Sequence, residues 1–427
     1  MHRYFNGVRD KEYRRISLPE LYEIFRKNVR ALEKVKVETR NALGYVLAEP
    51  IYARFDRPLA DISHVDGFAV NASDLVYASK HTPVVLKLVK SIDPRRADSY
   101  KLRRGETVFV ETGYPIPEGA NAVVPVEDVE VKGDRILFTK PVVPGNHVFK
   151  RGTDFRENSL VFRRGTRITP LVVKALLDLG YDEVLVYRRP RVSILSIGDE
   201  LIDEAYKPGS NKLPASTRFM DAYSLEYYGA EITCTRIVPD DPPTIASEVS
   251  NLLGGVDLVV TIGGVSMGPR DYTWIALYRE LKPNVWWRGV KILPGRSNSG
   301  MIVDDKPVIN QPGLHQSSFT TLVLILTPLA NYMQGRGLKP VYPFREVMLT
   351  EDLVNSRYID HYRIHFLELR DGEATPIENP GSYHLRPMTA STAFTVVDPG
   401  IERIRKGSYI RAYFYPPVHV PRAHPIL

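Results

Sequence analysis

A glycine-rich loop after an apolar strand is the most informative segment for chemistry. The strand DLVVTI runs into Gly263-Gly-Val-Ser-Met-Gly268, and a helix follows from about Tyr272. Glycines let backbone N–H groups approach an anion, Ser266 adds a hydroxyl donor, and the helix N-terminus adds a favourable dipole. The segment predicts a site for a phosphate-bearing ligand, with a tight turn that binds nothing as the alternative.

Acidic residues follow the strands of the same region. Asp199 and Glu200 come after VSILSI, Asp240 and Asp241 after ITCTRIV, and Asp271 after the glycine loop. In open α/β sheets the carboxyl ends of parallel strands meet at one edge, where ligands bind. Mg²⁺ typically takes one or two carboxylates together with waters and phosphate oxygens. We therefore predict a Mg²⁺ site at Glu200, Asp240 and Asp271; helix capping or surface solvation is the alternative for each carboxylate alone.

Two loops outside this region also combine polar residues with turn residues. The first is Asp61-Ile-Ser-His-Val-Asp66-Gly67, and the second, 111–127, contains Thr112-Gly113 and a proline-rich turn. Their composition alone is equally compatible with a structural and a functional loop.

The elements that must position the glycine loop alternate between strand and helix. After the strand VSILSI the pattern predicts helices over 217–228, from Pro242 to about Gly254, over 272–281 and over 317–333, with a further strand over 308–310. Strands that alternate with helices at this spacing are typical of a doubly wound parallel sheet.

The flanking segments follow different patterns. Ser17-Leu-Pro-Glu20 is a capping box, and the helix that it begins carries one apolar face of Leu18, Leu21, Phe25, Val29 and Leu32. Short β-type runs fill 56–154, and 160–187 is expected to be helical with a stop at Gly180. Beyond 335–340 the alternation predicts a second small β domain.

Composition narrows the function classes. A chain of 427 residues is expected to form two to four domains. No apolar run approaches the ~20 residues of a membrane span, and no Lys/Arg run within the net charge of +7 indicates a nucleic-acid groove. The single Cys234 excludes an internal disulfide. We expect a cytoplasmic protein without membrane or nucleic-acid partners, and 33 prolines are typical of heat adaptation.

The order of these motifs over nearly the whole chain resembles the molybdopterin molybdenumtransferase family, which comprises bacterial and archaeal MoeA proteins and the E domain of gephyrin. The pattern D-x-S-x-M-D-G-Y/F-A is similar to residues 61–69, and T-G-A-P-x-P-x-G-A-D-A-V to residues 112–123. G-x-D matches Gly152–Asp154, G-D-E-L matches Gly198–Leu201, and the D-D pair matches Asp240-Asp241. The pattern G-G-V-S-x-G-x-x-D-Y is intact at 263–272.

The resemblance implies a multidomain fold of a central doubly wound parallel α/β domain like that of MogA, an elongated helical domain with an inserted β domain, and a C-terminal β barrel. The corresponding ranges are 189–336 for the α/β domain, 1–55 with 155–188 for the helical domain, 56–154 for the inserted domain and 337–427 for the barrel. It also implies a homodimer whose active site is shared between subunits, and a divergent, archaeal or thermophilic member.

The implied activity is a transferase reaction of molybdenum cofactor biosynthesis. Molybdate or tungstate is inserted into adenylylated molybdopterin with Mg²⁺, and AMP is released; the substrate would be handed over by the molybdopterin adenylyltransferase. The resemblance assigns catalysis to Asp61, Thr112, Glu200, Asp240 and Asp271. It assigns substrate binding to Asp154, Ser216, Gly263, Gly264, Ser266, Gly268, Lys291, Arg296, Pro312 and Gly313.

The chain departs from the family where oxyanion and pterin contacts are expected. Leu293 replaces a lysine of I-K-P-G-K-P, although Lys291 and Arg296 could supply charge. L-P-G-N-P becomes 311–315 (QPGLH), and D-S-N becomes 215–217 (AST). These departures suggest a non-catalytic molybdopterin-binding scaffold as one alternative; a second is a molybdopterin adenylyltransferase that uses the same α/β domain. The retained carboxylates favour the transferase, because a scaffold needs no Mg²⁺ cluster.

Overall fold

The computed structural model describes residues 15–265, 273–355 and 357–415. These residues form two compact units. One comprises the described residues of Met1–Val37, Ala42–Ala48 and Leu185–Leu427, and the other comprises Glu38–Asn41 and Glu49–Val184. The four domain ranges expected from the sequence remain a prediction, and each unit is described below by itself.

A six-stranded sheet forms the centre of the first unit, in the order β17-β14-β18-β22-β21-β19. The strands β17 (Glu231–Val238), β14 (Arg191–Ile197), β18 (Leu258–Ile262) and β22 (Lys306–Gln311) are parallel. The strands β21 (Ser299–Val303) and β19 (Val285–Arg288) extend the sheet in antiparallel fashion. The predicted parallel sheet is confirmed, and the antiparallel extension was not predicted.

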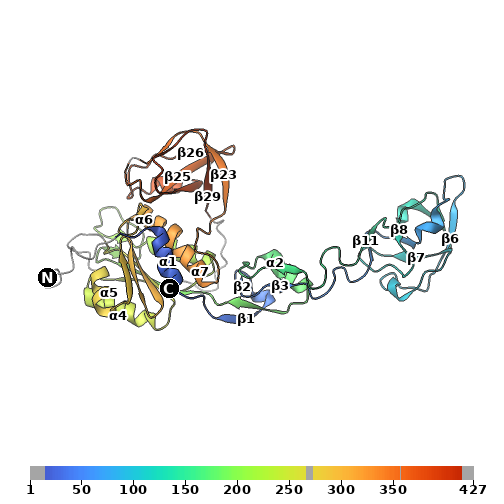
Figure 1. Ribbon diagram of the computed structural model, residues 1–427, viewed down its shortest axis with the longest axis horizontal. Helices are drawn as coiled ribbons and strands as arrows, with labels where there is room; N and C mark the ends of the chain where they lie inside the picture. Colours follow the sequence, from blue (N-terminus) through green and yellow to red (C-terminus); the bar gives the residue numbers. More distant parts are fainter. Residues whose placement is uncertain (1–14, 266–272, 356, 416–427) are drawn as a thin grey trace. The chain divides into compact units, whose positions relative to one another are not determined.

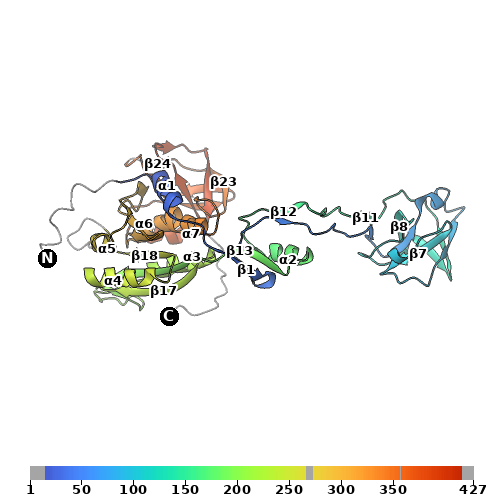
Figure 2. The same ribbon diagram turned by 60° about the horizontal axis from the view of Figure 1, so that its bottom comes forward.

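Helices cover both faces of this sheet (Figure 1). The helices α4 (Pro242–Leu253) and α5 (Thr273–Leu281) share one apolar core with the sheet. The other face packs against α1 (Leu18–Asn28), α3 (Thr217–Tyr227), α6 (His315–Thr321) and α7 (Thr327–Met333). Figure 2 shows the two helical layers from a second side. The fold is therefore doubly wound, as predicted.

Three expectations about helices need correction. The segment 160–187 is not one helix: β12 (Leu160–Phe162) and β13 (Glu183–Tyr187) flank the short helix α2 (Pro170–Asp178). The helix predicted over 317–333 begins at His315, and a π-helical turn over Leu322–Leu326 joins α6 to α7. The capping box of α1 is confirmed, but the helix ends at Asn28, so Val29 and Leu32 lie beyond it.

The second unit contains the predicted β module. Its six-stranded sheet has the order β8-β5-β7-β6-β10-β9. These strands are Ala122–Pro125, Gly67–Val70, Glu106–Val110, Val84–Leu88, Arg135–Phe138 and Val129–Lys132. Two short ribbons lead to the module: β4 (Ile62–Ser63) pairs with β11 (Val148–Phe149), and β3 (Ile51–Tyr52) pairs with β12. A separate sheet, most of whose residues belong to the first unit, joins β1 (Lys34–Glu38), β13 and β2 (Val46–Leu47).

The predicted C-terminal barrel is closed. The strands β25 (Tyr362–Arg370), β26 (Glu373–Pro376), β23 (Phe344–Leu349), β29 (Tyr409–Phe414) and β27 (Ala393–Val397) follow one another, and β27 pairs again with β25. The strand β20 (Ile292–Leu293) joins β25 in parallel, so a segment beside the α/β sheet also belongs to the barrel sheet. The remaining elements are β15 (Leu201–Ile202), β16 (Leu213–Pro214), β24 (Leu353–Val354), β28 (Arg403–Ile404) and α8 (Arg386–Ala390).

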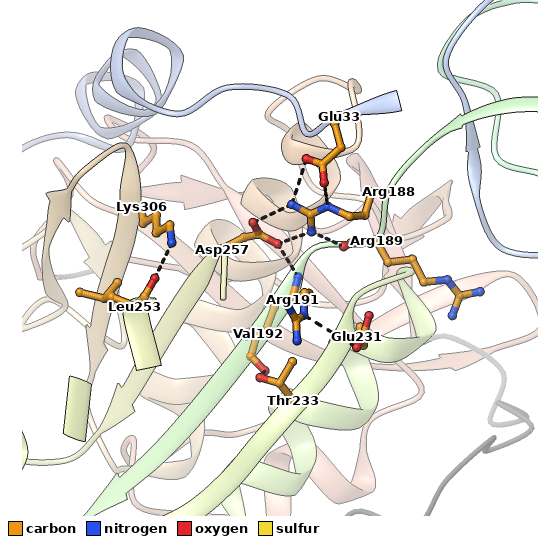
Figure 3. Close-up of polar contacts among 10 residues, drawn as sticks. All are labelled: Glu33, Arg188, Arg189, Arg191, Val192, Glu231, Thr233, Leu253, Asp257 and Lys306. Atoms are coloured by element: carbon orange, nitrogen blue, oxygen red, sulfur yellow. Dashed lines mark hydrogen bonds and ion pairs between the residues drawn. The ribbon is translucent and has the colours of Figure 1, made fainter. Parts of the chain in front are cut away.

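An arginine fixes the point where the chain enters the α/β sheet (Figure 3). The Arg188 guanidinium donates two hydrogen bonds to the Asp257 carboxylate, at 2.7 and 2.9 Å, and also binds Glu33. Asp257 accepts a further bond of 2.7 Å from the backbone N–H of Arg191. Paired charge-assisted bonds are strong and directional, so this cluster sets the start of β14 relative to β18.

Among the helices that the structure describes, none combines the length and the apolar character needed to cross a bilayer.

The sheet provides a test of packing at Gly300. A Cβ atom at this position would lie 2.6 Å from the carbonyl oxygen of Val308 and against the Trp287 ring. We expect Gly300→Ala to lower the free energy of unfolding by about 1–3 kcal/mol, because the neighbouring strand must shift. Gly254→Ala is the control, since its Cβ would meet nothing closer than 3.7 Å. Urea unfolding measures both, and equal stabilities of the two variants would contradict this packing.

Candidate active site

Four loops lie in a row at the carboxyl edge of the parallel strands, and hydrogen bonds join neighbours. The Gly198 N–H donates to the Val238 carbonyl at 3.1 Å, and the Gly263 N–H donates to the Gln311 carbonyl at 3.0 Å. The backbone N–H of Asp240 donates to the Asp199 carboxylate at 3.2 Å. The acidic loops, the glycine loop and the segment after β22 therefore share one edge, as the sequence predicted.

The glycine loop needs glycine at its first two positions. Gly263 and Gly264 have φ values of +104° and +62°, in the region that favours glycine. A Cβ at Gly263 would also lie 2.6 Å from the Ile197 carbonyl oxygen. The loop thus brings bare backbone against the end of β14. The predicted residues Ser266, Gly268 and Asp271 lie outside the described residues.

A cleft of about 350 Å³ opens between the glycine loop and two other segments. Its lining comes from the glycine loop, the segment 293–297, the segment 312–317 and one barrel residue. These residues are Gly264, Val265, Leu293, Pro294, Gly295, Arg296, Ser297, Pro312, Gly313, Leu314, Ser317 and Ser382. Four predicted substrate-binding residues, Gly264, Arg296, Pro312 and Gly313, therefore share one cavity.

Among the described residues that line this cleft, Arg296 supplies positive charge. Its guanidinium lies over the Tyr358 ring, 4.8 Å from the ring centroid, which restrains it by a cation–π contact. Lys291 does not line the cleft and instead forms an ion pair of 3.0 Å with Asp360. The bonds from Lys291 and His361 lower the pKa of Asp360 to about 2. Leu293 contributes an apolar wall where the resemblance has a lysine.

The C-terminal barrel builds part of the cleft wall. The Gln316 side chain donates to Asn379 Oδ1 at 3.0 Å, to the Gly381 carbonyl at 3.1 Å and to the His384 carbonyl at 2.7 Å. These bonds hold the barrel loop 379–384 against the start of α6, and Ser382 from that loop faces the cleft. The altered segment 311–315 therefore lies beside a barrel loop that the sequence motifs did not predict to be near the site.

The acidic loops present two carboxylates with different surroundings. Asp241 is the N-cap of α4 and accepts bonds from the Thr244 hydroxyl and N–H, which lower its pKa. Asp240 does not cap the helix. The Glu200 carboxylate folds back on Gly198, where an added Cβ would lie 2.6 Å from Glu200 Oε2.

The exposed Glu200 and the half-buried Asp240 follow neighbouring strands, and carboxylates in such positions suit a hard cation. Within the described part of the chain, no group of three His, Cys, Asp or Glu side chains could hold a metal ion. The donor set of Glu200 and Asp240 nevertheless fits Mg²⁺, because this ion commonly takes only one or two carboxylates and completes its shell with water and phosphate oxygens.

In the second unit, Asp61 is held by basic partners. Lys150 Nζ donates to its carboxylate at 2.7 Å, and the Arg151 backbone N–H donates at 2.9 Å. Partial burial opposes ionisation, but these two bonds outweigh it and lower the pKa of Asp61. Asp61 is therefore a carboxylate held in place by Lys150 and the Arg151 backbone.

Thr112 lies in the loop beside Asp61. Its N–H and hydroxyl both donate to Asp66 Oδ1, at 2.7 and 2.8 Å, and the backbone bond is the main cause of the lowered pKa of Asp66. The Ile116 N–H donates to the Asp61 carbonyl at 3.0 Å, so the two loops are adjacent. Asp66 was not among the predicted site residues, although it is part of the quoted D-x-S-x-M-D-G pattern.

The last two predicted residues lie at other places. Asp154 forms an ion pair of 3.0 Å with Arg57, which also pairs with Asp178, and all three border a hollow of about 830 Å³ in the second unit. Ser216 is exposed at the N-cap position of α3 and makes no side-chain capping bond.

The Lys150–Asp61 pair provides a test of the electrostatics. Lys150→Met removes the ammonium while the partial burial of Asp61 remains, so the pKa of Asp61 should rise. Carboxyl ¹³C NMR titration measures this change. Lys132→Met, which removes an exposed lysine paired with Glu130 in the same module, should leave Asp61 unchanged. An unaltered Asp61 titration in Lys150→Met would contradict the assignment.

Comparisons with known proteins agree with this arrangement. Residues 16–180 match the model of the MoeA N-terminal region (domain I and II), and residues 193–331 match the probable molybdopterin binding domain. Molybdopterin molybdenumtransferase 2 of Mycobacterium tuberculosis is 27% identical over 401 residues, which cover 93% of this chain and 99% of that protein. Molybdopterin molybdenumtransferase of Staphylococcus aureus is 28% identical over 71% of this chain and 73% of its own.

Among solved structures, the molybdopterin biosynthesis moeA protein of Pyrococcus horikoshii OT3 matches with a TM-score of 0.80 and 26% identity, covering 94% of this chain and 100% of that one. The two adjoining family models, the relative that matches over 99% of its length and the shared fold all indicate the same family. The chain therefore belongs to the molybdopterin molybdenumtransferase (MoeA) family.

Proposed function

We propose that this protein is a transferase of molybdenum cofactor biosynthesis that inserts molybdate or tungstate into adenylylated molybdopterin and releases AMP. The observation that carries the proposal is the cleft at the strand ends, where Gly264, Arg296 and Gly313 surround one cavity. Bare backbone and one guanidinium suit an oxyanion. The named activity of the relatives provides the substrate class.

Each loop at the sheet edge would have a different role in the reaction. The glycine loop would hold phosphate oxygens of the adenylylated pterin through its backbone, because donors fixed before reaction need no reorganisation. Glu200 and Asp240, together with Asp271, would hold Mg²⁺, which when bound neutralises the phosphoanhydride. Arg296, restrained on Tyr358, would attract the incoming oxyanion into the cleft.

The proposal also includes a homodimer, in which residues of the second unit contribute to the active site of the other subunit. Asp61 and Thr112 would face the α/β cleft of a second subunit, and Asp154 would border the same substrate. The support within this chain is that two leucines of α2 are exposed, Leu171 at 78% and Leu177 at 43%. Exposed apolar groups of this kind are typical of protein interfaces. Direct transfer of the substrate from the adenylyltransferase and a cytoplasmic location belong to the same proposal.

A non-catalytic scaffold is the second candidate. The observation in its favour is Leu293, which gives the cleft an apolar wall and one positive charge fewer than the family pattern. Retained pterin binding without turnover would support it.

The reaction is tested by AMP release from adenylylated molybdopterin with Mg²⁺ and molybdate or tungstate. We expect turnover by the wild type and a loss on the order of 10²-fold in Asp240→Asn, as for other groups that stabilise charge in a transition state. Asp241→Asn is the matched control: it removes the same charge from the next residue, and asparagine caps helices as well as aspartate does.

The outcomes separate the candidates. Equal AMP release by Asp240→Asn and Asp241→Asn would exclude the assigned role of Asp240. No AMP release by the wild type with either oxyanion, together with pterin binding, would favour the scaffold. Adenylylation of free molybdopterin with ATP would identify an adenylyltransferase instead.

The dimer is tested by light scattering at micromolar concentration. We expect a mass near twice the 48.4 kDa of the chain, and a monomer for Leu171→Asp, because a charge is costly inside an apolar interface. Val76→Asp, at an exposed apolar residue of the β module, should stay dimeric. A monomeric wild type would rule out a shared active site.

A further inference from the structure

A buried acid–amide pair lies directly beneath the cleft. Asp221 on α3 and Gln311 at the end of β22 both have 0% exposure. Gln311 Nε2 donates to Asp221 Oδ2. The second oxygen of each side chain, Asp221 Oδ1 and Gln311 Oε1, has no hydrogen-bond partner in the described part of the chain. Gln311 is uncharged, so this contact gives an ionised Asp221 no counter-charge.

The Gln311 hydrogen bond favours an ionised Asp221, but burial of the carboxyl group outweighs it. The ionisable neighbour that interacts with Asp221 is the Tyr342 phenol, which is itself buried, and Tyr228 packs on Tyr342 with ring centroids 5.3 Å apart. Arg218, one turn earlier on α3, is paired with Asp203. A buried charge without a partner is very costly, and burial raises the pKa of Asp221 well above its ordinary value.

If Asp221 is a neutral acid, its second oxygen and that of Gln311 can form a hydrogen bond with each other. Protonation turns one Asp221 oxygen into a hydroxyl donor, and the Gln311 carbonyl oxygen is an acceptor without a donor. Acid and amide can then exchange two hydrogen bonds. An ionised Asp221 would leave two acceptors buried together, which costs the desolvation of both.

The pair is connected to both walls of the cleft. The backbone carbonyl of Gln311 accepts the Gly263 N–H at 3.0 Å, and the next residues, Pro312 and Gly313, line the cavity. An added Cβ on Gly313 would lie 4.0 Å from the Gly263 Cα, so the two loops are in contact. A side chain that fixes Gln311 therefore fixes both loops.

We propose that Asp221 is a positioning residue that, as a neutral acid, locks the Gln311 carboxamide and thereby sets the spacing of the glycine loop and the 312–313 loop around an oxyanion. This inference rests on the proposed function for the identity of the anion. It concerns a position where the quoted family pattern L-P-G-N-P has leucine in place of Gln311.

The protonation state is tested without substrate, by urea unfolding of the wild type and Asp221→Asn across pH. Above about pH 4 the unfolded wild type ionises Asp221 while the folded protein keeps the proton, so folding is progressively weakened. The asparagine has no such proton. The unfolding equilibrium constant of the wild type relative to Asp221→Asn should therefore rise about tenfold per pH unit until the folded acid ionises. A ratio that does not change with pH would overturn the inference.

The positioning role is tested by the dissociation constant for tungstate, measured by calorimetry at pH 7. Asp221→Asn keeps an amide that can form both bonds, so its affinity should stay within about twofold of the wild type. Asp221→Ala removes the partner that holds the Gln311 side chain. We therefore expect tungstate to bind on the order of tenfold more weakly. If Asp221→Ala does not fold, Gln311→Met gives the same readout from the other partner.

The outcomes distinguish the inference from the proposed function. Wild-type affinity in both Asp221→Ala and Gln311→Met would overturn the positioning role while leaving the transferase intact. A wild type that binds no tungstate would overturn the anion assignment of the proposed function, and the positioning role with it. Weaker binding in Asp221→Ala with normal binding in Asp221→Asn supports the inference.

Discussion

One backbone hydrogen bond determines the geometry of the candidate site: the Gly263 N–H donates to the Gln311 carbonyl at 3.0 Å. It continues the β18–β22 ladder past the pair Ile262 and Gln311, at the point where both strands turn into loops. Because of this bond the glycine loop and the 312–313 loop leave the sheet side by side, and a cleft forms between them and the segment 293–297. Gly263 must be a glycine here, since a side chain would strike the Ile197 carbonyl.

Charge decides what such a cleft can bind. Glu200 lies on the loop next to the glycine loop and Asp240 on the loop after that, and both would repel a phosphate unless a cation lies between them. On the other side, the basic side chain among the described residues that line the cleft is Arg296; Lys291 is paired with Asp360, and Leu293 stands at the third basic position of the family pattern. The described part of the site is therefore divided into an acidic half suited to a cation and a half where Arg296 supplies positive charge.

The sequence predicted the local features of this site well. Apolar strands, the helix cap at Ser17 and paired glycines depend on neighbouring residues, so their patterns can be read directly. Contacts between distant segments could not be predicted in this way. Ser382 enters the cleft only because Gln316 anchors a barrel loop, and Arg296 is restrained by Tyr358 some 60 residues later in the chain. The Asp221–Gln311 pair is also non-local, and an isolated aspartate in a helix gives no sign that it is buried. The 160–187 segment was misassigned because its apolar residues suit a buried strand as well as a helix.

The most direct test of the central claim is the position of a bound oxyanion. Tungsten scatters X-rays anomalously, so a crystal of this protein grown with tungstate would locate it without reference to activity. The account predicts an anomalous peak in the cleft bordered by Gly264, Arg296 and Gly313. A well-occupied peak elsewhere on the chain, with none in this cleft, would contradict the assignment of the strand-end cleft as the place where the metal oxyanion arrives.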